Sequence, residues 1–429
     1  MRGMTLWSRL LGVEHTIVED ADWECGALIM RVRPAARQRF RCPKCRRTCP
    51  KYDRGQVRRW RHLDFGAIMV FLEAQAPRVR CKRHGVIVAA VPWARHGAGH
   101  THAFDDQVAW LATRTSKSAA CELMRITWRT VGSIITRVWA DLSGGADRLG
   151  GLRRIGIDEV SYKKGHKYLI VVVDHDTRRL VWAAEGRDSA TLNEFFAALG
   201  AQRCAQLTHI TCDAASWITK SVAAKCPQAI VCADPFHIVS WATEALDELR
   251  RARWREAAAA AKTEKRPGPG RPPKGTPPRQ AAATAGTYKT IRWALWKNPE
   301  DLTEHQQFKL EWLQTADPAL HRGYLLKEGL RLVFQAPDRQ TAEQILDRWC
   351  SWASRSRLEP FVKLGRTIKA HRADILAAIE NKLSNGLIES VNTKIRLLTR
   401  IAFGFHSATA LIALAMLSLG GTKPQLPGR

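Results

Sequence analysis

The order of the expected strands and helices between residues 152 and 240 limits the fold more than any other feature of the chain. Apolar and β-branched runs separated by turn residues predict strands, and one apolar face at helical spacing predicts a helix. The expected order is strand Arg154–Val160, strand Lys167–Asp174, strand Leu180–Glu185, helix Thr191–Leu199, strand Leu207–Cys212, helix Ser216–Lys225 and strand Ala229–Ala233. Three successive strands followed by alternating helices and strands predict an α/β sandwich around one mixed sheet.

Carboxylates stand at the ends of two of these expected strands. Asp158 ends the first strand and Asp213 follows the fourth. Carboxylates at neighbouring strand ends can share Mg²⁺ or Mn²⁺, hard cations that prefer oxygen ligands. Two such ions serve phosphoryl transfer by activating the attacking oxygen and stabilising the leaving one. We expect the third carboxylate from Glu389, which lies early in an amphipathic helix on the same face as Asn385 and Asn392.

The charge of the chain indicates its partner. Lys and Arg number 68 against 40 Asp and Glu, which gives a net charge of +28 spread along the whole sequence. Such a surface attracts polyanions, so nucleic acid is the expected partner and an anionic membrane the weaker alternative. The apolar run Ala408–Gly421 is shorter than the roughly 18 residues that span a bilayer, and we expect a core helix there. The odd count of 11 Cys is typical of free thiols in a reducing cytoplasm.

Two pairs of metal-binding residues occur in the N-terminal part of the chain, each with two residues between its members. The pairs are Cys42 with Cys45 and Cys81 with His84. Together they complete a tetrahedral zinc shell, and the strand-like residues between them favour a ribbon over a finger. Cys49 or His62 could replace His84 as the fourth ligand. Reduced cysteines without a metal are the simpler alternative.

Residues 102–140 have apolar residues at helical spacing, with a short break at Arg125–Thr127. Thr127 is a natural N-cap for a helix that begins at Trp128. Two helices joined by a tight turn after a first helix suggest a helix-turn-helix, although an ordinary helical hairpin fits the pattern nearly as well. The candidate DNA contacts on the last helix, on the basic hairpin after Asp158 and on the C-terminal helix are Trp128, Arg129, Ser133, Arg137, Lys163, Lys164, Arg396 and Arg400.

Four motifs resemble those of one known family. They are GIDE at 156–159, ITCDAAS at 210–216, DPFHIV at 234–239 and SNGLIESVNTKIRLLTRIAFGF at 384–405. They are similar to the bacterial insertion-sequence transposases of the ISL-three (ISL3) family. The resemblance implies a ribonuclease-H-like catalytic fold with a helical insertion and an N-terminal zinc ribbon. It also implies action on the terminal inverted repeats of a mobile element, with Asp158, Asp213 and Glu389 as the catalytic carboxylates. Where this chain has His84, the family more often has Cys.

Asp234 competes with Asp213 for the second catalytic position. It ends the fifth expected strand and lies three residues before His237. We prefer Asp213, because the fourth strand should lie beside the first in a ribonuclease-H-like sheet. Asp234 and His237 then become groups that orient the ligands or the DNA. Either aspartate taken alone is more commonly a turn or cap residue.

The sequence thus predicts a DDE-type DNA transposase with DNA as its partner, acting as a homodimer or higher oligomer on DNA and without a membrane. The expected location is the bacterial cytoplasm, at the nucleoid. A non-catalytic DNA-binding regulator and another ribonuclease-H-like nuclease are the alternatives. The expected regions are a zinc ribbon at 1–98, a helix-turn-helix at 99–145, the first part of the catalytic core at 150–240, a helical insertion at 241–380 with a Pro-rich linker at 264–279, and the C-terminal core helices at 381–425.

Overall fold

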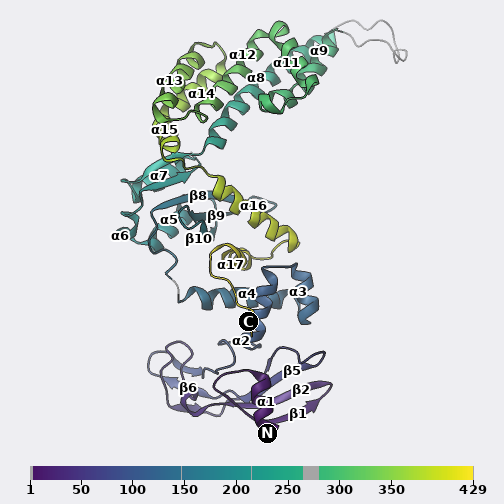
Figure 1. Cartoon of the computed structure of the whole chain (residues 1–429), viewed down its shortest axis with the longest axis vertical. Helices are drawn as coiled ribbons and strands as arrows, with labels where there is room; N and C mark the ends of the chain where they lie inside the picture. Colours follow the sequence, from purple (N-terminus) through teal and green to yellow (C-terminus); the bar gives the residue numbers. More distant parts are fainter. Residues whose placement is uncertain (1–2, 146, 214, 264–279, 429) are drawn as a thin grey trace, which may run out of the picture.

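The computed structural model describes residues 3–145, 147–213, 215–263 and 280–428. The expected Pro-rich linker, 264–279, lies outside the described residues. The molecule is elongated, with two small sheets at the N-terminal end, a five-stranded sheet in the middle and a helical bundle at the other end (Figure 1). No helix among the described residues combines the length and apolar character needed to cross a membrane.

The central sheet has the strand order β10-β9-β8-β11-β12. The first three strands pair antiparallel, and β8, β11 and β12 pair parallel, so the predicted mixed sheet is confirmed. The predicted strand and helix starts lie within two residues of the observed ones, and the first strand continues to Lys163. The elements are β8 (Arg154–Lys163), β9 (Lys167–Asp174), β10 (Arg179–Glu185), α5 (Ser189–Leu199), α6 (Ala201–Cys204), β11 (His209–Cys212), α7 (Ser216–Lys225) and β12 (Ile230–Ala233).

Helices cover both faces of this sheet. On one face, buried residues of β8 and β11 pack against α5 and α7, with Ile157, Phe195 and Ile218 in one hydrophobic cluster. On the other face lie α16 (Gly386–Ile401) and α17 (Ala408–Leu419). The C-terminal apolar run is therefore the core helix that its length predicts, with Leu411 and Leu417 fully buried.

Three helices precede the sheet: α2 (His102–Ala112), α3 (Lys117–Met124) and α4 (Trp128–Ser143). The Thr127 hydroxyl accepts a hydrogen bond from the Thr130 backbone N–H, which confirms the predicted N-cap of α4. The buried face of α4 packs against α2 and α17 and joins the same hydrophobic cluster as the sheet. The helix-turn-helix is thus fused to the catalytic core instead of standing apart on a linker.

The N-terminal domain, residues 3–98, contains two sheets after the short helix α1 (Gly3–Leu11). Their strand orders are β1-β2-β5-β4 and β3-β6-β7. Short apolar runs at 25–32 and 67–73 predict two strands, and these correspond to β2 and β5, each shifted by two residues. Cys25 lies in the turn before β2. The strands are β1 (Thr16–Glu24), β2 (Ala27–Pro34), β3 (Lys51–Asp53), β4 (Val57–Arg61), β5 (Met69–Gln75), β6 (Arg78–Cys81) and β7 (Gly85–Val88).

The insertion between β12 and α16 is helical, as predicted, and has its own hydrophobic cluster. Its first helix begins at Pro235, directly after β12, so the expected boundary at residue 241 falls inside that helix. The helices are α8 (Pro235–Thr263), α9 (Gln280–Thr290), α10 (Arg292–Leu295), α11 (Glu304–Ala316), α12 (Pro318–Val333), α13 (Arg339–Arg355), α14 (Glu359–Ala370) and α15 (Arg372–Asn381).

Candidate active site

Three aspartates lie side by side at one edge of the central sheet. In the two parallel ladders, Cys212 pairs with Ile157 on one side and with Ala233 on the other. The next residue on each of the three strands is an aspartate: Asp158, Asp213 and Asp234. The expectation that β11 lies beside β8 is confirmed, and the same register also brings Asp234 to this edge.

Strand alternation decides which face these carboxylates share. Ile157 and Cys212 point into the hydrophobic cluster under α5 and α7. Because successive side chains on a strand point to opposite faces, the aspartates that follow point to the other face. That face is covered by α16, which packs directly on β8.

The helix α16 is bonded to the sheet through Asp158. Asn392, which is 2% exposed, donates from Nδ2 to Asp158 Oδ2 at 2.7 Å. Glu389 is exposed and lies three residues before Asn392, about one turn earlier on the same side of the helix. The third expected carboxylate therefore lies on the part of α16 that meets Asp158.

His237 lies between the other two aspartates. Its Nδ1 is 3.7 Å from Asp213 Oδ1, and its Nε2 is 3.8 Å from Asp234 Oδ2. The Asn385 backbone N–H donates to Asp234 Oδ1 at 3.4 Å, which attaches the start of α16 to β12. Besides Asp234 itself, the other three predicted accessory residues, His237, Asn385 and Asn392, thus contact, or lie within 4 Å of, one of the three aspartates.

Burial of these carboxylates makes their negative charge costly. Desolvation, together with the neighbouring Asp213 and against the lowering effect of the Glu159 backbone N–H and of His237, raises the pKa of Asp158 to about 6. Desolvation also raises the pKa of Asp234. A bound cation would offset this cost, because it favours the charged form of each carboxylate.

Several buried polar atoms at this edge have no hydrogen-bond partner among the described residues. They are Asp234 Oδ2, Asn392 Oδ1 and both side-chain polar atoms of Asn385. Buried polar groups are ordinarily paired, so unpaired oxygens beside three carboxylates indicate room for a further ligand. A hard divalent cation and its water molecules fit this set of donors. The residues present therefore fit the metal ions that the sequence predicts.

The zinc ligands in the N-terminal domain form a more compact group. Among the described residues, the metal-binding side chains whose ligand atoms all lie within 4.8 Å of one another are Cys42, Cys45, Cys81 and His84. The Sγ–Nδ1 distances from His84 are 3.4 Å to Cys42 and 3.5 Å to Cys81, and Cys45 Sγ lies 3.7 Å from Cys81 Sγ. A zinc tetrahedron with Zn–S of about 2.3 Å has edges of about 3.5–3.8 Å. The four residues fit zinc.

The two alternative fourth ligands do not join this group. Cys49 donates from Sγ to the Arg47 carbonyl oxygen at 3.4 Å. His62 is buried with Nδ1 2.9 Å from the Thr101 hydroxyl oxygen, and burial lowers the pKa of its imidazole to about 4. The geometry therefore favours His84 as the fourth ligand.

The predicted DNA contacts on α4 divide into two pairs. Arg129 and Ser133 are exposed, as expected. Trp128 is only partly exposed and packs under the Lys117 ammonium, which lies 4.8 Å from its ring centroid. Arg137 donates two hydrogen bonds, each 2.9 Å long, to the buried Asp105. Helical spacing predicts that Trp128 and Arg137 are exposed, and this is wrong, because Lys117 of α3 and Asp105 of α2 contact them.

The four basic candidates outside α4 are all exposed. Lys163 and Lys164 lie where β8 turns toward β9, and Arg396 and Arg400 lie on α16. Sequence reasoning missed Glu159, which follows Asp158, pairs with Arg187 and has a pKa raised by desolvation. It also missed Asp105, although adjacent acids at 105 and 106 are unusual in so basic a region.

Comparisons with known proteins agree with this arrangement. Residues 155–415 match the ISL3 family model described as transposase, and residues 89–139 match the model described as helix-turn-helix domain of transposase family ISL3. Residues 38–84 match the zinc-finger of transposase IS204/IS1001/IS1096/IS1165.

Individual relatives are similar over nearly their whole length. Over all of this chain, identity is 59% to the transposases for insertion sequence element IS1557 of two Mycobacterium tuberculosis strains, CDC 1551 / Oshkosh and ATCC 25618 / H37Rv, with 98% of each covered. Identity is 23% to the transposase for insertion sequence element IS1001 of Bordetella parapertussis, over 88% of each protein. With its zinc ribbon, its DNA-binding helix-turn-helix and its DDE catalytic domain, the chain belongs to the ISL3 family of transposases, enzymes that cleave and transfer DNA strands.

Proposed function

We propose that Asp158, Asp213 and Glu389 are the catalytic carboxylates and hold Mg²⁺ or Mn²⁺ beside the scissile phosphodiester. One observation carries this assignment: the Asn392–Asp158 hydrogen bond brings the helix that bears Glu389 onto the strand end shared by the aspartates. Asp213 is preferred to Asp234, because β11 is the strand directly beside β8 and Asp213 is the less buried of the two.

Each neighbouring residue has a defined part in this proposal. Asn392 orients the Asp158 carboxylate, and Asn385 fixes Asp234 through its backbone N–H. His237 lies between Asp213 and Asp234 and orients their carboxylates. When bound, the divalent ions activate the attacking oxygen and stabilise the leaving oxygen. Water displaces a DNA oxygen at phosphorus in cleavage, and the 3′ hydroxyl so formed displaces another in strand transfer.

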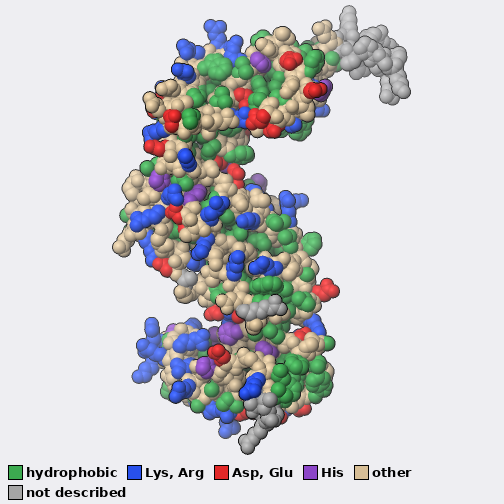
Figure 2. All heavy atoms as spheres, in the orientation of Figure 1, with side chains coloured by type: hydrophobic (Ala, Val, Ile, Leu, Met, Phe, Trp, Pro, Cys, Tyr) green, Lys and Arg blue, Asp and Glu red, His purple; other side chains and the backbone are tan. Residues whose placement is uncertain are grey.

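The DNA substrates are the terminal inverted repeats of an insertion sequence and a target duplex. Arg396 and Arg400 follow Glu389 by seven and eleven residues, which places them on nearly the same face of α16. A basic strip thus leads away from the proposed catalytic glutamate. Lys and Arg side chains also lie over the visible face of the catalytic core in Figure 2. Arg129 and Ser133 on α4 are the proposed contacts of the helix-turn-helix.

The proposal also covers the assembly and the location of the protein. Because a transposase must act on two DNA ends together, we propose a homodimer or a higher oligomer on DNA. The net charge of +28 favours association with the nucleoid in the bacterial cytoplasm. The cysteines among the described residues are free thiols, which suits a reducing compartment.

Four single substitutions test the assignment in a strand-cleavage assay with Mg²⁺ and a terminal-repeat duplex. We expect Asp158→Asn, Asp213→Asn and Glu389→Gln each to lower the cleavage rate by about 10³-fold or more, since the metal supplies several kcal/mol. Asp234→Asn should lower it by about 10- to 100-fold, as for a group that orients a ligand. DNA binding serves as the control and should be retained. Full cleavage by Asp213→Asn would overturn the assignment.

A further inference from the structure

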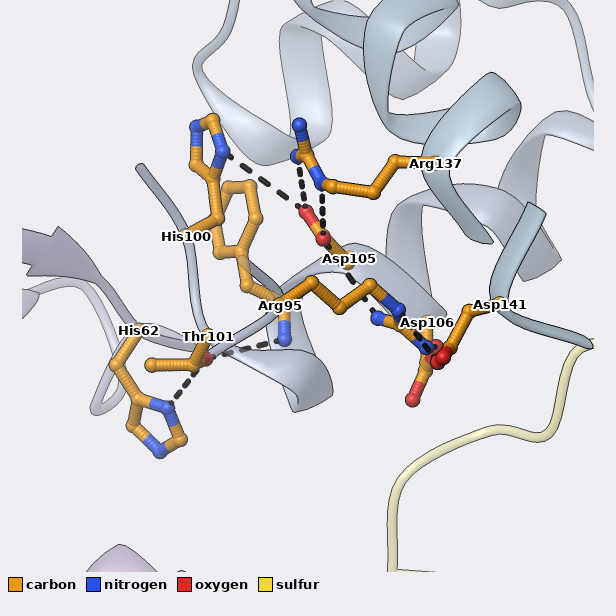
Figure 3. Close-up of polar contacts among 9 residues, drawn as sticks. His62, Arg95, His100, Thr101, Asp105, Asp106, Arg137 and Asp141 are labelled. Atoms are coloured by element: carbon orange, nitrogen blue, oxygen red, sulfur yellow. Dashed lines mark hydrogen bonds and ion pairs between the residues drawn. The ribbon is translucent and has the colours of Figure 1, made fainter. Parts of the chain in front are cut away.

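A buried carboxylate connects two helices of the DNA-binding region. Asp105 in the first turn of α2 is completely buried. Arg137 of α4 donates to both of its oxygens, from Nε to Oδ2 and from an Nη to Oδ1, each at 2.9 Å. Figure 3 shows the guanidinium facing the carboxylate in this two-pronged arrangement. The angle between α2 and α4 is therefore fixed by a planar, charge-assisted pair.

Arg95, in the segment that leads from the N-terminal domain into α2, binds the same two helices. Its side chain is 8% exposed. It donates to Asp106 of α2 at 2.7 Å and to Asp141 of α4 at 2.9 Å, and its remaining Nη lies 3.6 Å from Asp105. Figure 3 shows its guanidinium reaching toward these acids. We call Arg95, Asp105, Asp106, Arg137 and Asp141 the joint.

The segment that carries Arg95 is also bonded back to the N-terminal domain. The Arg61 backbone N–H donates to the Gly99 carbonyl oxygen, and the Thr101 backbone N–H donates to the Arg61 carbonyl oxygen, both at 2.9 Å. The buried His62 ring lies 2.9 Å from the Thr101 hydroxyl oxygen. The segment between the joint and the N-terminal domain is thus hydrogen-bonded to β4 through Arg61.

A second attachment comes from the turn between α3 and α4. Arg125, in the turn between α3 and α4, donates to the Ala67 carbonyl oxygen at 3.0 Å. Its guanidinium also lies 3.5 Å from Asp64, which pairs with Arg61. The two attachments meet at Arg61 and together oppose rotation of the N-terminal domain about the connecting segment.

The zinc turns are held close to α4 by this arrangement. Arg46, on the first zinc turn, and Asp141 of α4 line the same cavity of about 160 Å³. The zinc turns carry five exposed cations that form no ion pair within the described ranges: Lys44, Arg46, Arg47, Lys82 and Arg83. Unpaired cations at both the zinc turns and α4 suit contacts with DNA phosphates.

We infer that the zinc ribbon and the helix-turn-helix contact the transposon end as one rigid unit, so that the end contains two contacted segments at a spacing fixed by the protein. Arg95 and Asp105 are then positioning residues that determine specificity, although neither touches DNA. A rotation that separates the partners of a buried pair leaves an uncompensated charge, which is costly. The joint therefore resists small rotations. The inference rests on the proposed binding of terminal repeats by the helix-turn-helix.

The first test varies the DNA and uses the wild-type full-length chain. A footprint on a terminal-repeat duplex locates the two protected segments, and Arg129→Ala identifies the one contacted by α4. Inserting two base pairs between the segments displaces them by about 7 Å and rotates them by about 70°. We expect the affinity for the duplex to fall at least 10-fold, to the affinity for a duplex that contains only one of the two protected segments. An affinity within about 3-fold of the native duplex would overturn the inference.

The second test varies the joint. In Arg95→Gln and Asp105→Asn, the loss of affinity caused by the two-base-pair insertion should shrink from at least 10-fold to about 3-fold or less. Asp141→Asn, whose side chain is half-exposed, is a milder variant in case the buried ones fold poorly. As a control, Arg33→Gln removes an exposed arginine of the N-terminal domain that pairs with Glu19, and this variant should show the full loss of affinity on insertion. Equal losses in the wild type and in folded joint variants would contradict the inference.

The two proposals fail in different ways. If the wild-type chain binds the terminal repeat no better than random duplex DNA, the proposed function fails. If it binds the repeat specifically but tolerates altered spacing, only the rigid unit is wrong. Zinc content and thermal unfolding of each variant distinguish a loosened joint from an unfolded domain.

Discussion

The zinc centre and the proposed active site are two metal sites assembled in opposite ways. In the zinc centre, four ligand atoms from two short turns already lie at the mutual distances that a tetrahedral ion requires. In the active site, the ligands come from two strand ends and from a helix about 180 residues further along, and their carboxylates do not form such a compact group in the described part of the chain. Local turns fix the first site, whereas long-range packing assembles the second.

This difference reflects the ligand chemistry. Thiols and an imidazole can lie close together when uncharged, and the Arg83 backbone N–H lowers the pKa of Cys81 to about 7, which eases its conversion to thiolate. Carboxylates repel one another at neutral pH, and two-metal chemistry holds them around ions about 3.5–4 Å apart. The zinc site is thus preformed for folding, while the proposed active site would depend on α16 and on the ions that it would bind.

The largest effect is expected where the preformed site is broken. Cys45→Ser should abolish stoichiometric zinc binding, because a structural zinc contributes about 10–16 kcal/mol of apparent binding free energy. The zinc ribbon should unfold, and terminal-repeat affinity should fall by about 10-fold or more, since the zinc turns lose their geometry. Metal analysis of the purified protein measures the zinc. Cys25→Ser, at an exposed free cysteine, is the matched control and should keep one zinc per chain. Unchanged zinc in Cys45→Ser would reject the site.

A smaller effect is expected where the active site is held by one contact. Asn392→Ala removes the hydrogen bond to Asp158 and should lower metal-dependent cleavage by about 10- to 100-fold, with DNA binding unchanged. The Mg²⁺ concentration for half-maximal cleavage should rise in parallel. Asn381→Ala removes a similar amide at the end of α15 and should cleave normally. If both variants behave alike, Asn392 has no special role at the site.

The smallest expected effect is the pH dependence of the stability that His62 contributes, and it distinguishes His62 from a zinc ligand. The pKa of His62 is lowered to about 4 by burial, below its ordinary 6.5, so the unfolded chain binds a proton more readily. The stability due to neutral His62 is therefore lost as pH falls below about 6.5, by about 1 kcal/mol between pH 7 and 5.5. Denaturant unfolding should show this loss in the wild type and a smaller one in His62→Gln, with zinc content unchanged. Loss of zinc in His62→Gln would instead make His62 a ligand.

The sequence predicted the parts of the molecule whose signals are local. The strand and helix order of the core, the Thr127 cap and the zinc pairs follow from short patterns, and all appear where expected. β1 was missed, because its mixture of polar and apolar residues lacks a clear alternation. The family assignment of the chain is confirmed, whereas the roles of Asp158, Asp213 and Glu389 remain predictions.

The parts that could not be predicted depend on contacts between distant residues. Helical spacing placed Arg137 on the outer face of α4, but only the fold shows that Asp105 lies opposite it. In the same way, the pattern around Asp234 did not show that its strand continues the register of β8 and β11. A sequence pattern predicts on which face of a helix or strand a residue lies, whereas the residue that it contacts there depends on the tertiary arrangement.

The helix α8 has a mechanical consequence for the enzyme. It begins one residue after Asp234, carries His237 in its first turn and continues without a break for 29 residues, about 43 Å. It therefore joins the sheet edge to the bundle of α9 to α15, which is also attached to the sheet where α15 packs on β12 (Figure 1). A tilt of about 5° at the start of α8 displaces its far end by about 4 Å. A movement of the distant bundle is therefore transmitted to the histidine beside the three aspartates.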